Sequence, residues 1–149
     1  MQLSSRSCTT SARPTARAPL SCALVAALSV AGCSLFNNNT SSTAETATLD
    51  AVPPSTETGT ATLTDTGNGT TQVAITTAGG TDTGVQSAVV RTGTCGSNGD
   101  VFAVINNVQA RASITTLSDD LASLSGGKYY IEIHSSTDVN TVVACGEIP

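Results

Sequence analysis

The chain contains no tryptophan and one histidine, and Phe, Tyr and Trp together make up only 3% of its 149 residues. Aromatic stacking platforms and tyrosine-rich binding surfaces are therefore not expected. Charged residues are also scarce, at 11%, which excludes the disorder that a high charge density produces. Six Lys and Arg against eleven Asp and Glu leave a net charge of −5. This balance argues against nucleic-acid binding, which needs a basic surface.

The N-terminal segment, residues 1–32, has the composition of an export signal. Arg6, Arg13 and Arg17 make it basic, and no acidic residue precedes Glu45. An apolar run over 20–31 follows the arginines. Its length suits the core of a signal peptide and is too short for a stable membrane-spanning helix. The sequence therefore predicts that the chain is exported.

The apolar run ends in Val30-Ala31-Gly32-Cys33. Small residues directly before a cysteine resemble a bacterial lipobox, and the resemblance implies cleavage before Cys33 and attachment of diacylglycerol to its sulfur. The alternative is an ordinary secretory signal in which Cys33 is incidental. The next residue is Ser34 rather than Asp, which is compatible with the outer membrane if the organism has two membranes. We therefore expect an extracytoplasmic lipoprotein of the cell envelope, anchored to the bacterial membrane.

Removal of residues 1–32 makes the remaining chain more acidic. Three basic residues then remain, Arg91, Arg111 and Lys128, together with all eleven acidic residues, and 3 − 11 gives a net charge of −8. Anionic lipid headgroups repel so acidic a surface. Stable anchoring needs two or more acyl chains, and the lipobox modification supplies that number. The membrane is thus expected to be a partner through the N-terminal lipid alone.

Five cysteines reduce to one pair once the signal is removed. Cys8 and Cys22 leave with the signal, and Cys33 carries the lipid, so Cys95 and Cys145 remain. An even pair in an oxidising compartment predicts a disulfide. The closed loop holds about 50 residues, which corresponds to roughly 4 kcal/mol in the chain-entropy description. The alternative is a redox-active or metal-binding pair, which no CxxC spacing supports.

The mature chain divides by composition into a tether and one domain. Residues 33–58 are low in complexity, with Asn37-Asn38-Asn39, many Thr, Ser and Ala, and then Pro53-Pro54. This composition predicts a flexible, lipidated tether. From Gly59 onward, short alternating segments are separated by turns rich in Gly and Asn, and they predict a single β domain over 59–149.

The spacing of these segments favours an all-β fold, a Greek-key β-sandwich or flattened barrel of about seven or eight short strands. A short helical turn is expected over 118–124, with Ser118 as its cap and Leu117, Leu121 and Leu124 on one face. The expected strands cover 60–64, 72–77, 86–91, 101–105, 112–117, 129–134 and 142–145.

The strand over 129–134 carries the only histidine. Alternation along a strand places Tyr129, Ile131 and Ile133 on the inner side. The outer side then carries Tyr130, Glu132 and His134, which predicts a surface histidine at the end of a strand, bonded to a nearby backbone group. The alternative is a weak Cu(II) or Zn(II) contact shared by His134 and Glu132.

The C-terminal half resembles the Cu,Zn superoxide dismutase fold. The residues that carry the resemblance are a Gly-rich loop with a cysteine over 93–99, the run over 130–134 that ends in His134, and a final Val-Ala-Cys-Gly-Glu-Ile over 143–148. The resemblance implies that Cys95 pairs with Cys145 and that His134 stands at a copper-ligand position. The Gly-Gly-Lys-Tyr run before His134 also resembles the end of CHRD-type domains.

The departures from the dismutase pattern decide the expected function. Val89 and Arg91 stand where the family has a His-x-His pair, and Val142 stands where it has an arginine. A redox copper site needs several imidazoles, and a hydrolytic zinc site needs three protein ligands. With one histidine, dismutation by the family mechanism is not expected.

We therefore expect a protein that is not an enzyme and holds no cofactor. Its expected role is a non-catalytic structural or binding module of the cell envelope on a degenerate dismutase-like fold, with an unknown envelope protein or polymer as partner. The alternative is an extracytoplasmic protein that binds copper or zinc through His134 and Glu132.

Overall fold

A computed structural model describes residues 42–149 of the chain. The expected signal peptide, Cys33 and the first part of the expected tether lie outside the described residues. Within the described part, no helix is long and apolar enough to cross a membrane.

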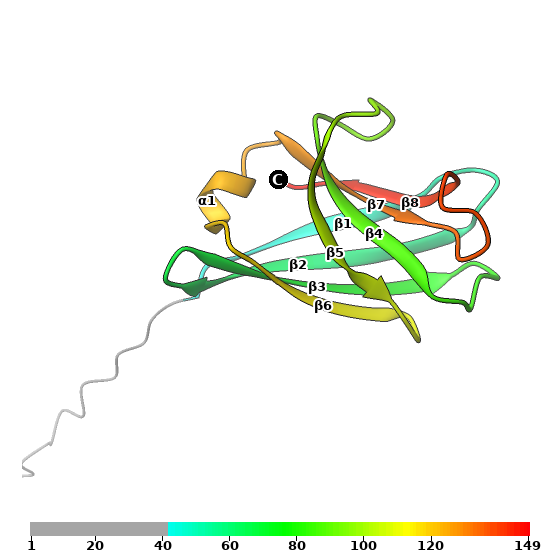
Figure 1. Cartoon of the computed structure of the whole chain (residues 1–149), viewed down its shortest axis with the longest axis horizontal. Coiled ribbons are helices and arrows are strands. Elements are labelled where there is room, and N and C mark those ends of the chain that lie inside the picture. Colours follow the sequence, from blue (N-terminus) through cyan, green and yellow to red (C-terminus); the bar gives the residue numbers. More distant parts are fainter. Residues whose placement is uncertain (1–41) are drawn as a thin grey trace, which may run out of the picture. The chain divides into compact units, whose positions relative to one another are not determined.

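Eight antiparallel strands form one sheet that curls into a nearly closed barrel, with a single helical turn at one end (Figure 1). The order of the strands is β5-β4-β7-β8-β1-β2-β3-β6. This confirms the predicted all-β barrel with one short helical turn. The strands are β1 (Ala44–Ala51), β2 (Glu57–Gly67), β3 (Thr70–Gly79), β4 (Gln86–Thr92), β5 (Val101–Val108), β6 (Ala112–Leu117), β7 (Tyr129–His134) and β8 (Val142–Glu147).

Strands β4 to β7 form the predicted Greek key. Short connections join β4 to β5 and β5 to β6, and β7 then returns to lie beside β4, which is the arrangement that defines the motif. The sheet closes where β5 meets β6. There an isolated backbone bridge between Gln109 and Ala112 closes the turn that connects the two strands.

The prediction of a tether over 33–58 is wrong for the residues from 44 onward. Residues 44–51 form β1, which lies in the middle of the sheet between β2 and β8. Its alternation is carried by small side chains, and Ala47 and Leu49 are the ones that point into the core. Neighbouring strands on both sides supply the burial that such a weakly apolar segment needs, and a composition rich in Thr and Ala does not reveal them.

The barrel interior is filled by aliphatic side chains, as the low aromatic content requires. Strand alternation places every second residue inside, and the hydrophobic effect of burying these side chains stabilises the barrel. The buried hydrophobic cluster comprises Ala47, Leu49, Ala61, Leu63, Val73, Ile75, Ala88, Val90, Ile105, Val108, Leu117, Leu121, Leu124, Ile131, Ile133, Val143, Ala144 and Ile148.

The helical turn α1 (Leu121–Leu124) is shorter than predicted and has a different cap. The side chain of Asp120, not Ser118, accepts a hydrogen bond from the Ser123 backbone N–H at 2.7 Å. Leu117, Leu121 and Leu124 are all buried, as predicted from their common face. Aspartate and serine are both good caps, so the position of the buried leucines decides where the turn begins.

Candidate functional site

The outer face of β7 is buried, in contrast to the prediction. Tyr130, Glu132 and His134 point away from the barrel core, yet they are 0%, 4% and 7% exposed. The prediction of a surface histidine is therefore wrong. Alternation assigned the direction of these side chains correctly, but it carries no information about what lies over them.

The loop over 93–100, which connects β4 to β5 and is called the Cys95 loop below, lies over this face at Tyr130. The disulfide between Cys95 and Cys145 fixes it to β8, so the two cysteines pair as predicted. The Gly99 backbone N–H donates to the Tyr130 hydroxyl at 3.2 Å. A Cβ on Gly99 would lie 1.7 Å from the Thr92 carbonyl oxygen, so only glycine allows the loop to approach this closely.

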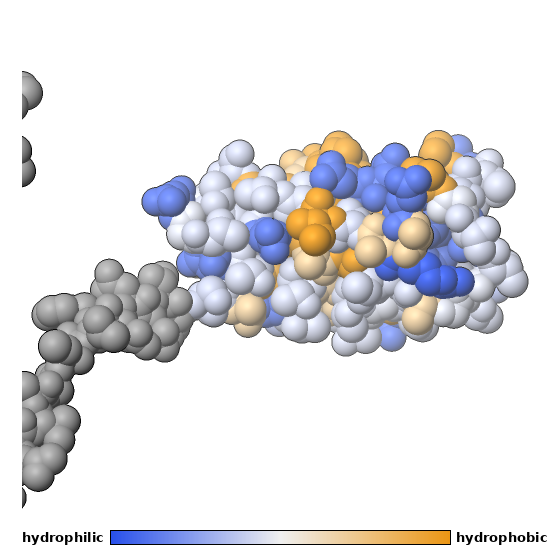
Figure 2. Space-filling view, turned by 90° about the horizontal axis from the view of Figure 1, so that it is seen from below, coloured by the Kyte–Doolittle hydropathy of each residue, from blue (hydrophilic) through white to orange (hydrophobic). Residues whose placement is uncertain are grey.

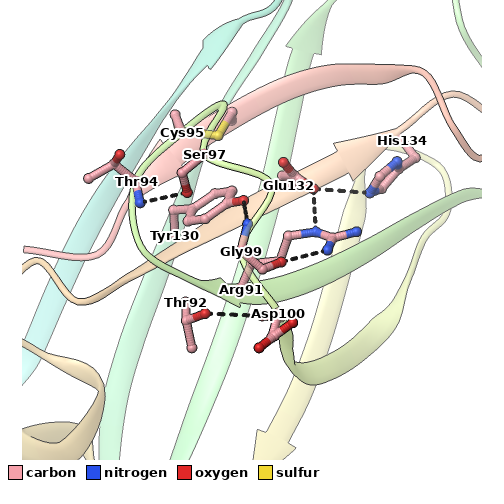
Figure 3. A network of polar contacts seen from close by, with 11 residues as sticks. Arg91, Thr92, Thr94, Cys95, Ser97, Gly99, Asp100, Tyr130, Glu132 and His134 are labelled. Carbon is pink, nitrogen blue, oxygen red and sulfur yellow. Dashed lines mark hydrogen bonds and ion pairs between the residues drawn. A yellow bond between two sulfur atoms is a disulfide. The ribbon is translucent and has the colours of Figure 1, made fainter.

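Beside this loop, Arg91, Glu132 and His134 form a polar cluster (Figure 3). Arg91 lies on β4 and its Nε donates to Oε2 of Glu132 at 2.6 Å. Its Nη1 donates to the Gly99 carbonyl oxygen at 2.8 Å. Nε2 of His134 lies 3.5 Å from the same Oε2 of Glu132. The cluster therefore joins two neighbouring strands and the Cys95 loop.

Charge pairing explains why Glu132 tolerates its burial. A buried carboxylate is costly unless a charged partner and hydrogen bonds compensate it, and the guanidinium of Arg91 provides both. From the sequence, Arg91 is noted only because it stands at a ligand position of the dismutase pattern. Its role as the partner of Glu132 was missed, although the two residues stand on strands that were both predicted.

The cluster is poorly suited to hold a cation. Arg91 already places a positive charge against the carboxylate that a metal ion would need. A buried ligand atom does stay unused, since Nδ1 of His134 has no hydrogen-bond partner among the described residues. Across residues 42–149, no group of three or more His, Cys, Asp or Glu side chains is placed to hold a metal ion. A contact of Cu(II) or Zn(II) with His134 and Glu132 stays a prediction.

A second buried polar pair, Glu57 and Gln86, lies at one end of the barrel interior and was not predicted. Glu57 is 1% exposed, and Nε2 of Gln86 donates to its Oε2 at 2.8 Å. The predicted strand over 60–64 is too short to include Glu57. Continued backward, its alternation places Glu57 on the same face as Ala61 and Leu63, so the signal was present in the sequence.

Asp82 joins two loops at this end. Its carboxylate accepts hydrogen bonds from the Ser136 hydroxyl at 2.5 Å and the Ser136 backbone N–H at 2.7 Å. It also accepts from Gly84 N–H and the Ser135 hydroxyl. These donors, above all those of Ser136, lower the pKa of Asp82 from 3.8 to about 2. These hydrogen bonds of Asp82 are called the Asp82 clamp below. A cleft of about 430 Å³ lies beside them, and Glu57 and Asp82 are among its lining residues.

Comparison of the chain with models of known protein families, with curated proteins and with solved structures finds no match. The resemblance to the dismutase and CHRD patterns therefore stays a prediction. What the geometry provides is a disulfide-fixed loop beside the Arg91–Glu132 ion pair on the outer face of the barrel.

Proposed function

We propose that the protein is a non-catalytic, lipid-anchored module of the bacterial cell envelope on a degenerate dismutase-like fold. The observation that supports a structural or binding role over catalysis is the state of the Arg91–Glu132 pair. Its carboxylate is engaged by a guanidinium and covered by a loop that a disulfide fixes. A general acid or base has to reach a substrate proton, and this carboxylate is used to hold strands and loop together.

Two features of the sequence support the location. The lipobox-like run ends at Cys33, and a disulfide between Cys95 and Cys145 suits an oxidising compartment outside the cytoplasm. Because β1 begins at Ala44, only residues 34–43 separate Cys33 from the barrel. Ten residues span at most about 35 Å. The anchor would therefore keep the barrel close to the bilayer, closer than a tether up to residue 58 would.

The test of this proposal is lipid labelling of the full chain in a bacterial host. Cells grow with an alkyne-tagged palmitate, and the chain is then immunoprecipitated and probed for the tag. We expect wild type and the matched control Cys22→Ser to carry the label and to sediment with membranes. Cys33→Ser should lose both properties. A labelled Cys33→Ser chain, or an unlabelled wild type, would overturn the anchor.

Metal binding is the rival function, and it would require a cation to displace Arg91 from Glu132. Titration of the purified chain with Cu(II) and Zn(II), beside His134→Ala, separates the two functions. Stoichiometric binding that His134→Ala abolishes would favour the rival.

A further inference from the structure

Strand β5 exposes apolar side chains at an edge of the sheet. Val104 is 73% exposed, and Val101 and Phe102 on the same strand are also among the exposed large hydrophobic residues. Ile114 on the facing strand β6 is exposed as well. Seen from the side of β6, hydrophobic atoms gather near the middle of a surface that is otherwise mostly hydrophilic or neutral (Figure 2).

The backbone of β5 over 101–105 is free on the side away from β4. The contact between β5 and β6 reaches as far as Asn106. Its N–H donates to the Thr115 hydroxyl, and its carbonyl oxygen accepts from the Ser113 hydroxyl. Backbone groups along a strand alternate in direction, so those of Val104 point the same way as those of Asn106. No described strand pairs with 101–105 on that side. This stretch is called the open edge below.

The open edge also lacks the charges that normally protect such an edge. Natural sheets block exposed edges with charged residues, proline or covering segments, and β5 contains no charged residue and no proline. The nearest charged residues along the chain are Asp100, directly before Val101, and Arg111 in the turn that follows β5. In a barrel with eleven acidic residues, the uncharged stretch 101–105 lets a second acidic copy approach without a like charge along the paired residues.

We propose that the open edge pairs with the open edge of a second copy of this chain. Antiparallel pairing of a strand with itself is satisfied by a twofold axis, the commonest symmetry of homodimers. It would bring the exposed valines of the two copies together and leave no charge between the paired strands. A strand of about five residues makes a small contact. Confinement by the lipid anchor, which belongs to the proposed function, would raise the effective concentration of the copies.

The experiment is cysteine crosslinking of the full chain in bacterial membranes with a short bismaleimide. Val104→Cys places a thiol on the open edge. Val139→Cys is the matched control, because Val139 is 66% exposed but lies in the loop between β7 and β8. Wild type controls for the native cysteines. We expect about tenfold more dimer for Val104→Cys than for Val139→Cys, and loss of this dimer when Val101→Lys is added.

The outcomes separate the edge from the anchor. Palmitate labelling of the same samples reports the anchor by itself. If the label is present and Val104→Cys gives no more dimer than Val139→Cys, the proposed pairing with a second copy is overturned, while the lipid anchor stands. Crosslinks of Val104→Cys only to other proteins would also overturn it. A dimer without the label keeps the edge pairing and removes the anchor. Because Val104 is exposed, its substitution leaves the core intact.

Discussion

Strands β7 and β5 lie on either side of β4, and their outer faces are opposites. The outer face of β7 carries Tyr130, Glu132 and His134 and is buried, whereas the outer face of β5 carries Val104 and is exposed. This reverses the usual preference of polar side chains for solvent. One cause is the Cys95 loop, which is fixed to β8 and contacts Tyr130 on the outer face of β7. A loop, rather than the polarity of the residues, decides which face is buried.

Removal of the disulfide is expected to have the largest effect on this contrast. The double variant Cys95→Ser/Cys145→Ser frees the Cys95 loop and should lower the free energy of unfolding by about 4 kcal/mol, because the unfolded chain regains the entropy of a loop of roughly 50 residues. Equilibrium unfolding in guanidinium measures it. Reduced wild type should behave like the variant. A loss below about 1 kcal/mol would show that the loop is held by its other contacts.

Removal of Arg91 is expected to have the next largest effect. Arg91→Ala leaves the carboxylate of Glu132 buried without its cation, which costs 3–5 kcal/mol for fully buried pairs. The side chain of Arg91 is 25% exposed, and solvent screening lowers the expected loss to about 2 kcal/mol. Arg91→Ala/Glu132→Gln should regain part of it, because no charge then remains buried. If the double variant is less stable than Arg91→Ala, the cost does not arise from an unpaired carboxylate.

Acid should loosen the Asp82 clamp, with the smallest effect of the three. The pKa of Asp82 is lowered from 3.8 to about 2 in the folded chain. The clamp therefore adds stability that is fully present above pH 3.8 and is lost as the pH falls toward 2. Asp82→Asn should flatten the dependence of unfolding on pH in this window. Asp100→Asn, an exposed carboxylate outside the clamp, is the control, and equal slopes for the two variants would contradict the assignment.

Most of the fold follows from local patterns in the sequence. Alternating apolar residues and Gly-rich turns predict seven of the eight strands, and the three leucines predict where the helical turn packs. Strand β1 was missed because its alternation is carried mainly by Ala and Thr, which give little local contrast. Its burial depends on β2 and β8 lying on either side of it, and that is a property of the assembled sheet.

The candidate site divides in the same way. Counting the cysteines predicts the pair Cys95 and Cys145, and alternation places Tyr130, Glu132 and His134 on one face. Neither pattern indicates that the loop carrying Cys95 covers that face, or that Arg91 meets Glu132 across two strands. These contacts join residues 31 to 50 positions apart, and chain folding alone brings them together.

By itself the sequence determined the all-β class, most of the strands, the direction of each side chain on β7 and the cysteine pair, because these depend on residue type and local spacing. Only the tertiary structure decided which outer face is buried and which is open. Burial depends on what packs over a surface, and here a distant loop covers the charges of β7 while the apolar edge of β5 is left without a partner among the described residues.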